Sequence, residues 1–200
     1  EYPKECKIVE WKDLEIYPGL ISPGSSLGLA EINALRATRD LSEVGTHTPE
    51  VESWVAINPD SELIPVARAN GVTHSLIIPM GGTISGTSGF VMLNGWGIEE
   101  MTLRKKVALH LWWPGHGLTF PQPHDKKDPT PKSIEEQIKE RKKRILEIDE
   151  FFDQAKSYQK GKLSKDSNFR KMPSWEAMLP VINRQIPIMI HADEKRQIKA

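Results

Sequence analysis

The chain has 200 residues, with 27 basic and 27 acidic side chains, so its formal net charge is zero. Hydrophobic residues make up 38% and charged residues 27%, which is typical of a globular domain and excludes a disordered or collagen-like chain. A neutral chain lacks the basic excess that bulk nucleic-acid binding needs, and no stretch approaches the ~20 apolar residues that span a bilayer. We therefore expect neither nucleic acid nor a membrane as a partner.

The single cysteine, Cys6, excludes an intrachain disulfide. This suits a reducing compartment, although many exported proteins also lack disulfides. The first residue is Glu1 rather than Met, so a signal peptide could have been removed before it. Two locations, the cytoplasm and the periplasm, therefore stay open.

The first part of the chain is expected to form short strands separated by loops. Two apolar-biased segments, 7–9 and 14–17, predict strands. Residues 60–70 carry a helix-start signal, and Gly71 is suited to end that helix. The β-branched residues of 72–78 predict a further strand.

The middle of the chain combines glycine, a continuous apolar run and a long amphipathic segment. Residues 81–97 contain six glycines, which predicts a long connection holding a small hairpin. Residues 106–113 are apolar without alternation, so we expect a strand buried on both faces, as in a parallel sheet. Residues 132–158 predict a helix, because isoleucines recur at helical spacing and Ser133 with Glu136 forms a capping-box signature.

Residues 114–131 are expected to form a loop, and a shorter helix is predicted over 174–184. The last expected strand covers 186–190. Strands that alternate with helices, and that lack polar alternation, favour an α/β fold with a parallel sheet.

The six histidines show neither HxH nor HExxH spacing, so no local metal motif is present. His191 ends an apolar strand, where functional residues of α/β folds gather, and is read either as a site residue or as a packed histidine. His116 would lie at the same end of the sheet. His74 and His110 lie inside strands, which favours buried and hydrogen-bonded side chains.

Three other features have weaker functional readings. Asp40 and Glu43 could bind a divalent cation, but such loops are more often solvated or form turns. The glycine-rich 81–89 segment matches no phosphate-binding motif. The basic run 139–144 is balanced by acidic residues of the same predicted helix, which indicates a solvated face.

Three segments, taken in order, resemble the amidohydrolase superfamily, and within it the imidazolonepropionase-like branch. The segment 16–21 (Ile-Tyr-Pro-Gly-Leu-Ile) resembles the link from the small β-sandwich to the first strand of the (β/α)8 barrel. The segment 69–73 (Ala-Asn-Gly-Val-Thr) is similar to the start of the second strand. The segment 186–192 is similar to a strand that ends in a metal-binding histidine. The resemblance covers residues 15–200.

The resemblance implies an α/β fold in which residues 18–200 form the N-terminal part of a TIM-like (β/α)8 barrel. Residues 1–17 would be the end of the small β-sandwich domain. It also implies a metal-dependent hydrolase that acts on amide, cyclic amide or related C–N bonds of a small molecule through a metal-activated water.

Family members carry an HxH pair of metal ligands on the first strand, but the aligned positions here are Gly24 and Ser26. His191 is the family metal ligand that carries over, which implies a mononuclear site for a divalent metal, commonly zinc. Gly24, Ser26 and His116 would line the substrate site.

The later family ligands would lie after Ala200, so the resemblance implies that the missing half of the barrel, or a second chain, completes the structure. Two alternatives stay open. One is a non-catalytic barrel that binds a ligand or a partner chain after losing its first-strand metal ligands. The other is an inactive fragment that folds only with its missing half.

Overall fold

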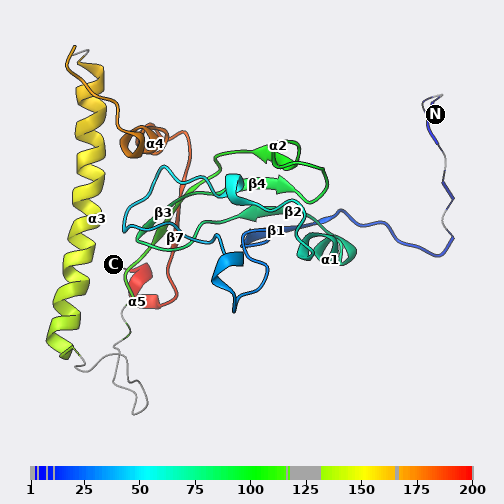
Figure 1. The fold of residues 1–200 in the computed structure, drawn as a ribbon, viewed down its shortest axis with the longest axis horizontal. Helices are drawn as coiled ribbons and strands as arrows, with labels where there is room; N and C mark the ends of the chain where they lie inside the picture. The colour runs from blue at the N-terminus through cyan, green and yellow to red at the C-terminus, as the bar shows by residue number, and fades with distance from the viewer. Residues whose placement is uncertain are drawn as a thin grey trace.

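The computed structural model describes residues 3, 5–7, 9–10, 12–115, 117, 132–164 and 167–199. These residues form a mixed α/β structure in which helices pack against two separate open sheets (Figure 1). The α/β prediction is confirmed at this level. The strands of the described ranges do not close into a barrel.

The larger sheet contains four strands, in the order β1 (Leu20–Ser25), β2 (Val72–Ile77), β4 (Gly89–Met92) and β5 (Thr102–Arg104). β1 and β2 are parallel because a crossover that includes α1 (Leu63–Ala69) joins them. β4 and β5 are antiparallel to their neighbours. The expected parallel sheet is therefore wrong: each of the two sheets contains antiparallel as well as parallel pairs.

The smaller sheet contains β3 (Ile84–Thr87), β6 (Leu109–Trp112) and β7 (Ile188–His191), in that order. β3 is antiparallel to β6, and β6 is parallel to β7. In this register Trp112 lies opposite His191. The strand predicted over 106–113 is confirmed as the shorter β6, which is largely buried.

The small hairpin expected within 81–97 is not formed. β3 and β4 are separated by one residue, Ser88, and belong to different sheets. One residue is too short for the two-residue turns that reverse a chain between paired strands. The backbone of Ser88 instead bonds to Ala108 and Val107, so the chain passes from one sheet into the other at this point.

Besides α1, the helices are α2 (Ile98–Met101), α3 (Ile134–Leu163), α4 (Pro173–Ile182) and α5 (Lys195–Ile198), and 3-10 turns lie at Arg36–Thr38 and Ser53–Ala56. The helices α1, α3 and α4 confirm the three helices predicted from the sequence. None of the described helices is long and apolar enough to cross a membrane.

Helix α3 begins where the capping box predicts. The hydroxyl of Ser133 accepts the N–H of Glu136 at 3.2 Å, and the Glu136 carboxylate accepts the N–H of Ser133 at 2.9 Å. The helix continues through Gly161, beyond the end predicted at residue 158. A Cβ at Gly161 would lie 3.3 Å from the ring of Phe169, so the glycine here serves close packing rather than helix termination.

The strands expected over 7–9 and 14–17 are absent from the described residues. The described residues before Leu20 are exposed and extend away from the sheets (Figure 1). Ile16 is 80% exposed, so no neighbouring strand covers this apolar segment. The predicted domain boundary between residues 17 and 18 stays a prediction.

Each sheet has its own hydrophobic core. The first packs the larger sheet against α1 and the loops around Trp54. The second packs β3 and β6 against α3 and α4. Its most deeply buried helix residues are Ile148, Ala155 and Met178. This second core holds β6 in place, and β6 pairs with β7; these two strands carry the candidate site.

Candidate functional site

His191 is the last residue of β7 and lies beside the end of β6. Because the two strands are parallel, their carboxyl ends meet at one edge of the sheet. The side chain of His191 is half-buried, whereas Ile188 and Ile190 alternate with it and are 37% and 57% exposed. The strand therefore presents His191 on its inner face.

His191 is hydrogen-bonded to His110, whose side chain is fully buried in the middle of β6. Nδ1 of His110 and Nε2 of His191 lie 2.8 Å apart, with ring centroids 5.1 Å apart and ring planes 26° apart. Nε2 of His110 is buried and has no hydrogen-bond partner among the described residues. The prediction that His110 is buried and hydrogen-bonded is confirmed, but its partner, 81 positions away, was not foreseen.

Trp112 forms one side of the site. Its ring stacks on that of His191, with centroids 3.8 Å apart and planes 11° apart. Its Nε1–H donates to the hydroxyl of Ser85 at 3.0 Å, and that hydroxyl donates to the carbonyl of Pro79 at 3.2 Å. Pro79 follows β2, so this chain of bonds connects the site to the larger sheet.

The side chain of Gln197 is almost wholly buried and joins the segment after β6 to the segment after β7 by hydrogen bonds. Its Oε1 accepts the N–H groups of Asp193 and Glu194, each at 2.7 Å. Its Nε2–H donates to the carbonyl of Trp113 at 3.2 Å. Gln197 therefore ties the backbone that follows His191 to the backbone that follows Trp112, and sequence reasoning missed this contribution.

The electrostatics of the site favour neutral imidazoles. Burial and, to a smaller extent, the neighbouring His191 together lower the pKa of His110 to about 4. Burial also lowers the pKa of His191, and the carboxylate of Asp193 opposes that shift. At neutral pH both rings are therefore uncharged, which is the form in which imidazole binds metals.

The other predicted site residues are not brought to His191 by any described contact. Gly24 lies in β1, and a Cβ placed on it would touch the side chain of Ile78 at 3.7 Å. Ser26 follows β1 and is half-buried. His116 lies outside the described residues. The roles of Gly24, Ser26 and His116 in substrate binding therefore stay predictions.

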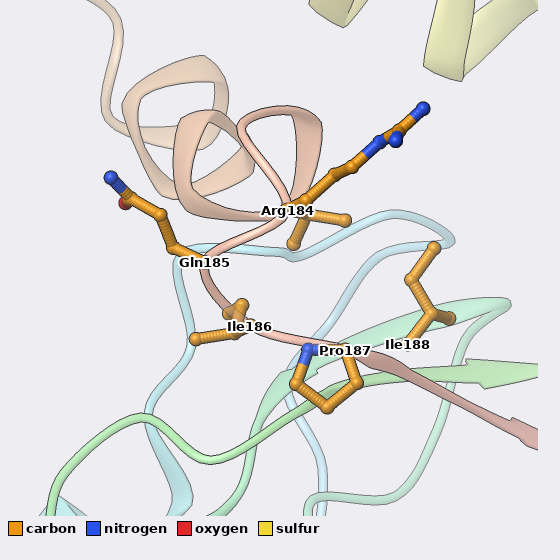
Figure 2. Close-up of a pocket in the computed structure, with 6 residues that line it drawn as sticks. Arg184, Gln185, Ile186, Pro187 and Ile188 are labelled. Carbon is orange, nitrogen blue, oxygen red and sulfur yellow. The ribbon is translucent and has the colours of Figure 1, made fainter.

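Two surface hollows lie away from His191. One, of about 420 Å³, is formed by Val181 and residues 184–188 before and at the start of β7, at the opposite end of the strand from His191 (Figure 2). In Figure 2 the side chain of Arg184 extends away from Pro187. Neither a titratable cluster nor a histidine lines this hollow.

The second hollow, of about 450 Å³, is lined by four carboxylates together with apolar groups: Asp40, Glu43, Glu50 and Glu52. Glu52 is already engaged, by the ammonium of Lys106 at 2.8 Å and by the indole N–H of Trp54. No group of three His, Cys, Asp or Glu side chains in the described ranges is placed to hold a metal ion. The cation alternative for Asp40 and Glu43 gains no support.

The same finding bears on His191. Its neutral imidazole is the kind of donor that zinc prefers, but catalytic zinc takes three protein ligands. The described residues therefore fit a divalent metal in donor type and supply only part of a ligand set.

No model of a known protein family matches the sequence, and no curated protein does. Among solved structures, the chain is similar to an amidohydrolase from Thermotoga maritima MSB8, with a TM-score of 0.72 and 22% sequence identity. The match covers 98% of this chain and 52% of that chain, so the protein spans about half the length of its structural neighbour. At this identity the likeness establishes a shared fold: the chain has the architecture of about half of that amidohydrolase.

Proposed function

We propose that the protein is part of a hydrolase of the amidohydrolase kind, which cleaves an amide, cyclic amide or related C–N bond of a small molecule. The observation that carries the proposal is the placement of His191: a neutral, half-buried imidazole at the carboxyl end of a parallel strand, held by Trp112 and His110. The shared fold with an amidohydrolase supports it.

In this proposal His191 binds one divalent metal ion, with zinc as the first candidate. Such an ion polarises a carbonyl group and lowers the pKa of a bound water toward neutrality. The stacked ring of Trp112 restricts rotation of the His191 side chain and covers one of its faces. Gly24 and Ser26, where the resembling family has histidines, add no imidazole, so the proposed centre is mononuclear.

The remaining ligands and the other wall of the site would come from the missing half of the barrel or from a second chain. β7 is an edge strand of its sheet, and Ile188 and Ile190 are exposed beside it. β1 is an edge strand of the other sheet, with Leu20 62% exposed. Free strand edges with apolar side chains favour pairing with further strands.

Metal content tests the proposal. The chain is assembled with the half or the second chain that supplies the other ligands, and its elements are measured by mass spectrometry after equilibration with zinc and removal of excess ion. We expect about one zinc per assembled site, as a mononuclear centre requires. His191→Gln should abolish this binding, while His74→Gln, on the other sheet, should leave it unchanged.

Absence of bound metal in the wild-type assembly, or retention of metal in His191→Gln, would overturn this metal site. Weight would then pass to a non-catalytic barrel that binds a ligand or a partner chain. Loss of metal in both variants would indicate a general loss of structure, which circular dichroism of each variant detects.

A further inference from the structure

We propose that Asn94 is a modification site, at which the side-chain amide deamidates spontaneously to give aspartate and isoaspartate. The sequence contains two Asn-Gly pairs, Asn70-Gly71 and Asn94-Gly95. Glycine favours this reaction in the residue before it, because it has no Cβ to shield the backbone nitrogen or to limit rotation. The inference is independent of the proposed function, which uses neither pair.

The reaction closes a ring within the pair. The backbone nitrogen of Gly95 loses its proton and attacks Cγ of Asn94, and as the new N–C bond forms, the bond from Cγ to the side-chain nitrogen breaks and ammonia leaves. Water then adds to one of the two carbonyls of the resulting succinimide and breaks the adjoining ring C–N bond. Cleavage at the side-chain carbonyl gives aspartate, and cleavage at the backbone carbonyl gives isoaspartate. Water is therefore the one co-reactant that the reaction needs.

The structure blocks ring closure at the first pair, although Asn70 is exposed. Nδ2 of Asn70 donates to the carbonyl of Val66 at 2.8 Å, and the N–H of Gly71 donates to the carbonyl of Arg68 at 2.9 Å. The carbonyl of Gly71 accepts the N–H of Leu20 at 2.8 Å. The ψ angle of Asn70 is 14°, which places the nitrogen of Gly71 close to the nitrogen of Asn70 and away from its Cβ. The attacking atom, the leaving group and the rotation between them are thus all restrained.

The second pair lacks these restraints. Asn94 lies between the end of β4 and the start of α2, and its side chain is exposed. Within the described part of the chain, no hydrogen bond holds the side chain of Asn94 or the N–H of Gly95. The nitrogen of Gly95 and Cγ of Asn94 are therefore free to approach each other.

Packing explains why a glycine follows Asn94. Gly95 has φ +144°, and a Cβ there would lie 2.8 Å from Cγ of Met101. The side chain of Met101 is buried in the core of the larger sheet. A larger residue at position 95 would displace this side chain, so the reactive pair is a consequence of the fold.

Deamidation changes the charge next to α2. A Cβ at position 95 would lie 3.5 Å from Cδ of Glu100, and the carboxylate of Glu100 accepts the N–H of Trp96 at 2.9 Å. The product places a new carboxylate one residue before this position, and the isoaspartate form also adds a methylene group to the main chain. Like charges this close repel, so the bond that fixes Trp96 should weaken.

Peptide mapping by mass spectrometry tests the inference on the whole chain. The folded protein is incubated in ¹⁸O-enriched water at neutral pH and at a higher pH, and the peptides of both Asn-Gly pairs are quantified over time. A parallel incubation in urea measures the two pairs without the fold. Asn94→Gln, which would have to close a larger ring, is the test variant, and Asn70→Gln is its matched control.

We expect Asn94 to deamidate about 10- to 30-fold faster than Asn70 in the folded protein, which is the effect of the two hydrogen bonds that must open at Asn70. In urea the two rates should agree to within a few-fold. The product should carry one ¹⁸O atom from hydrolysis of the succinimide, and the rate should rise with pH because the attacking nitrogen must lose its proton. Asn94→Gln should remove the main product, and Asn70→Gln should leave it unchanged.

Three results would overturn the inference. They are equal rates at the two pairs in the folded protein, a faster reaction at Asn70, and an intact Asn94 in the folded protein after both pairs have reacted in urea. If Asn94→Gln does not fold, the time courses of the wild type decide the question, because they compare the two pairs within one molecule.

Discussion

The indole of Trp112 lies flat on the imidazole of His191, with ring centroids 3.8 Å apart. The two residues are 79 positions apart in sequence and directly opposite in the register of β6 and β7. The same indole donates its N–H to Ser85 on β3. One side chain thus connects His191 to all three strands of the smaller sheet.

We expect Trp112→Phe to keep an aromatic ring over His191 and to lose the bond to Ser85. The free energy of unfolding should fall by about 1 kcal/mol for the lost hydrogen bond, plus a packing loss for the smaller ring. A double-mutant cycle with Ser85→Ala in urea unfolding isolates the bond. A coupling energy near zero would show that the indole N–H contributes nothing through Ser85.

Acid should destabilise the protein through His110. Its pKa is about 4 in the folded protein and near 6.5 when unfolded, so the unfolded state binds more protons between these values. The contribution of His110 to the free energy of unfolding is complete above pH 6.5 and is lost as the pH falls toward 4. The total loss is about 3 kcal/mol. The pKa of His47 is lowered by burial and acts in the same direction.

Urea unfolding measured from neutral pH down to pH 4 checks this expectation. His110→Asn should reduce the loss of stability across the window, because the buried titrating group is removed. His74→Gln serves as the control. Equal pH dependence in the wild type and His110→Asn would contradict the role of His110.

Gly86→Ala should be severely destabilising. Gly86 has φ +110°, and a Cβ there would lie 2.4 Å from the carbonyl oxygen of Val51. Gly71 has φ +84° and nothing within 4 Å of its Cβ position, so Gly71→Ala measures the backbone cost alone, about 1–2 kcal/mol. Thermal unfolding should show a clearly larger loss for Gly86→Ala, and equal losses would rule out the steric contact as the cause.

Ser133→Ala should lower the stability of the first turn of α3 by about 1 kcal/mol, because the N–H of Glu136 loses its acceptor. Hydrogen exchange of the amides in that turn measures the effect locally. Ser157→Ala, in the middle of the same helix, is the matched control for replacing a serine. Equal exchange rates in the two variants would show that the capping box is energetically silent.

The isolated 200-residue chain should self-associate through the edge formed by β7, because its unpaired backbone lies beside exposed isoleucines. Ile190→Lys places a charge on that edge and should weaken association at least 10-fold, measured by sedimentation across a concentration series. Leu163→Lys, on an even more exposed leucine at the end of α3, should have little effect. A monomer at all concentrations would show that this edge does not pair.

Local signals predicted the elements whose stability is local. The start of α3 follows from Ser133 and Glu136, and α1 ends just before Gly71 as expected. Short elements without such signals, α2 and β5, were missed. The expected hairpin failed because the apolar runs on either side of Ser88 do not reveal which sheet each one joins.

The sequence by itself determined the α/β composition, the long capped helix and the position of His191 at the end of a strand, because periodicity, caps and strand ends are properties of neighbouring residues. The tertiary structure alone decided that His110 and Trp112 meet His191, that Gln197 joins the segments behind them, and that the strands divide between two sheets. Those relationships depend on strand register across about 80 residues, and register is set by the packing of the whole core rather than by any local pattern.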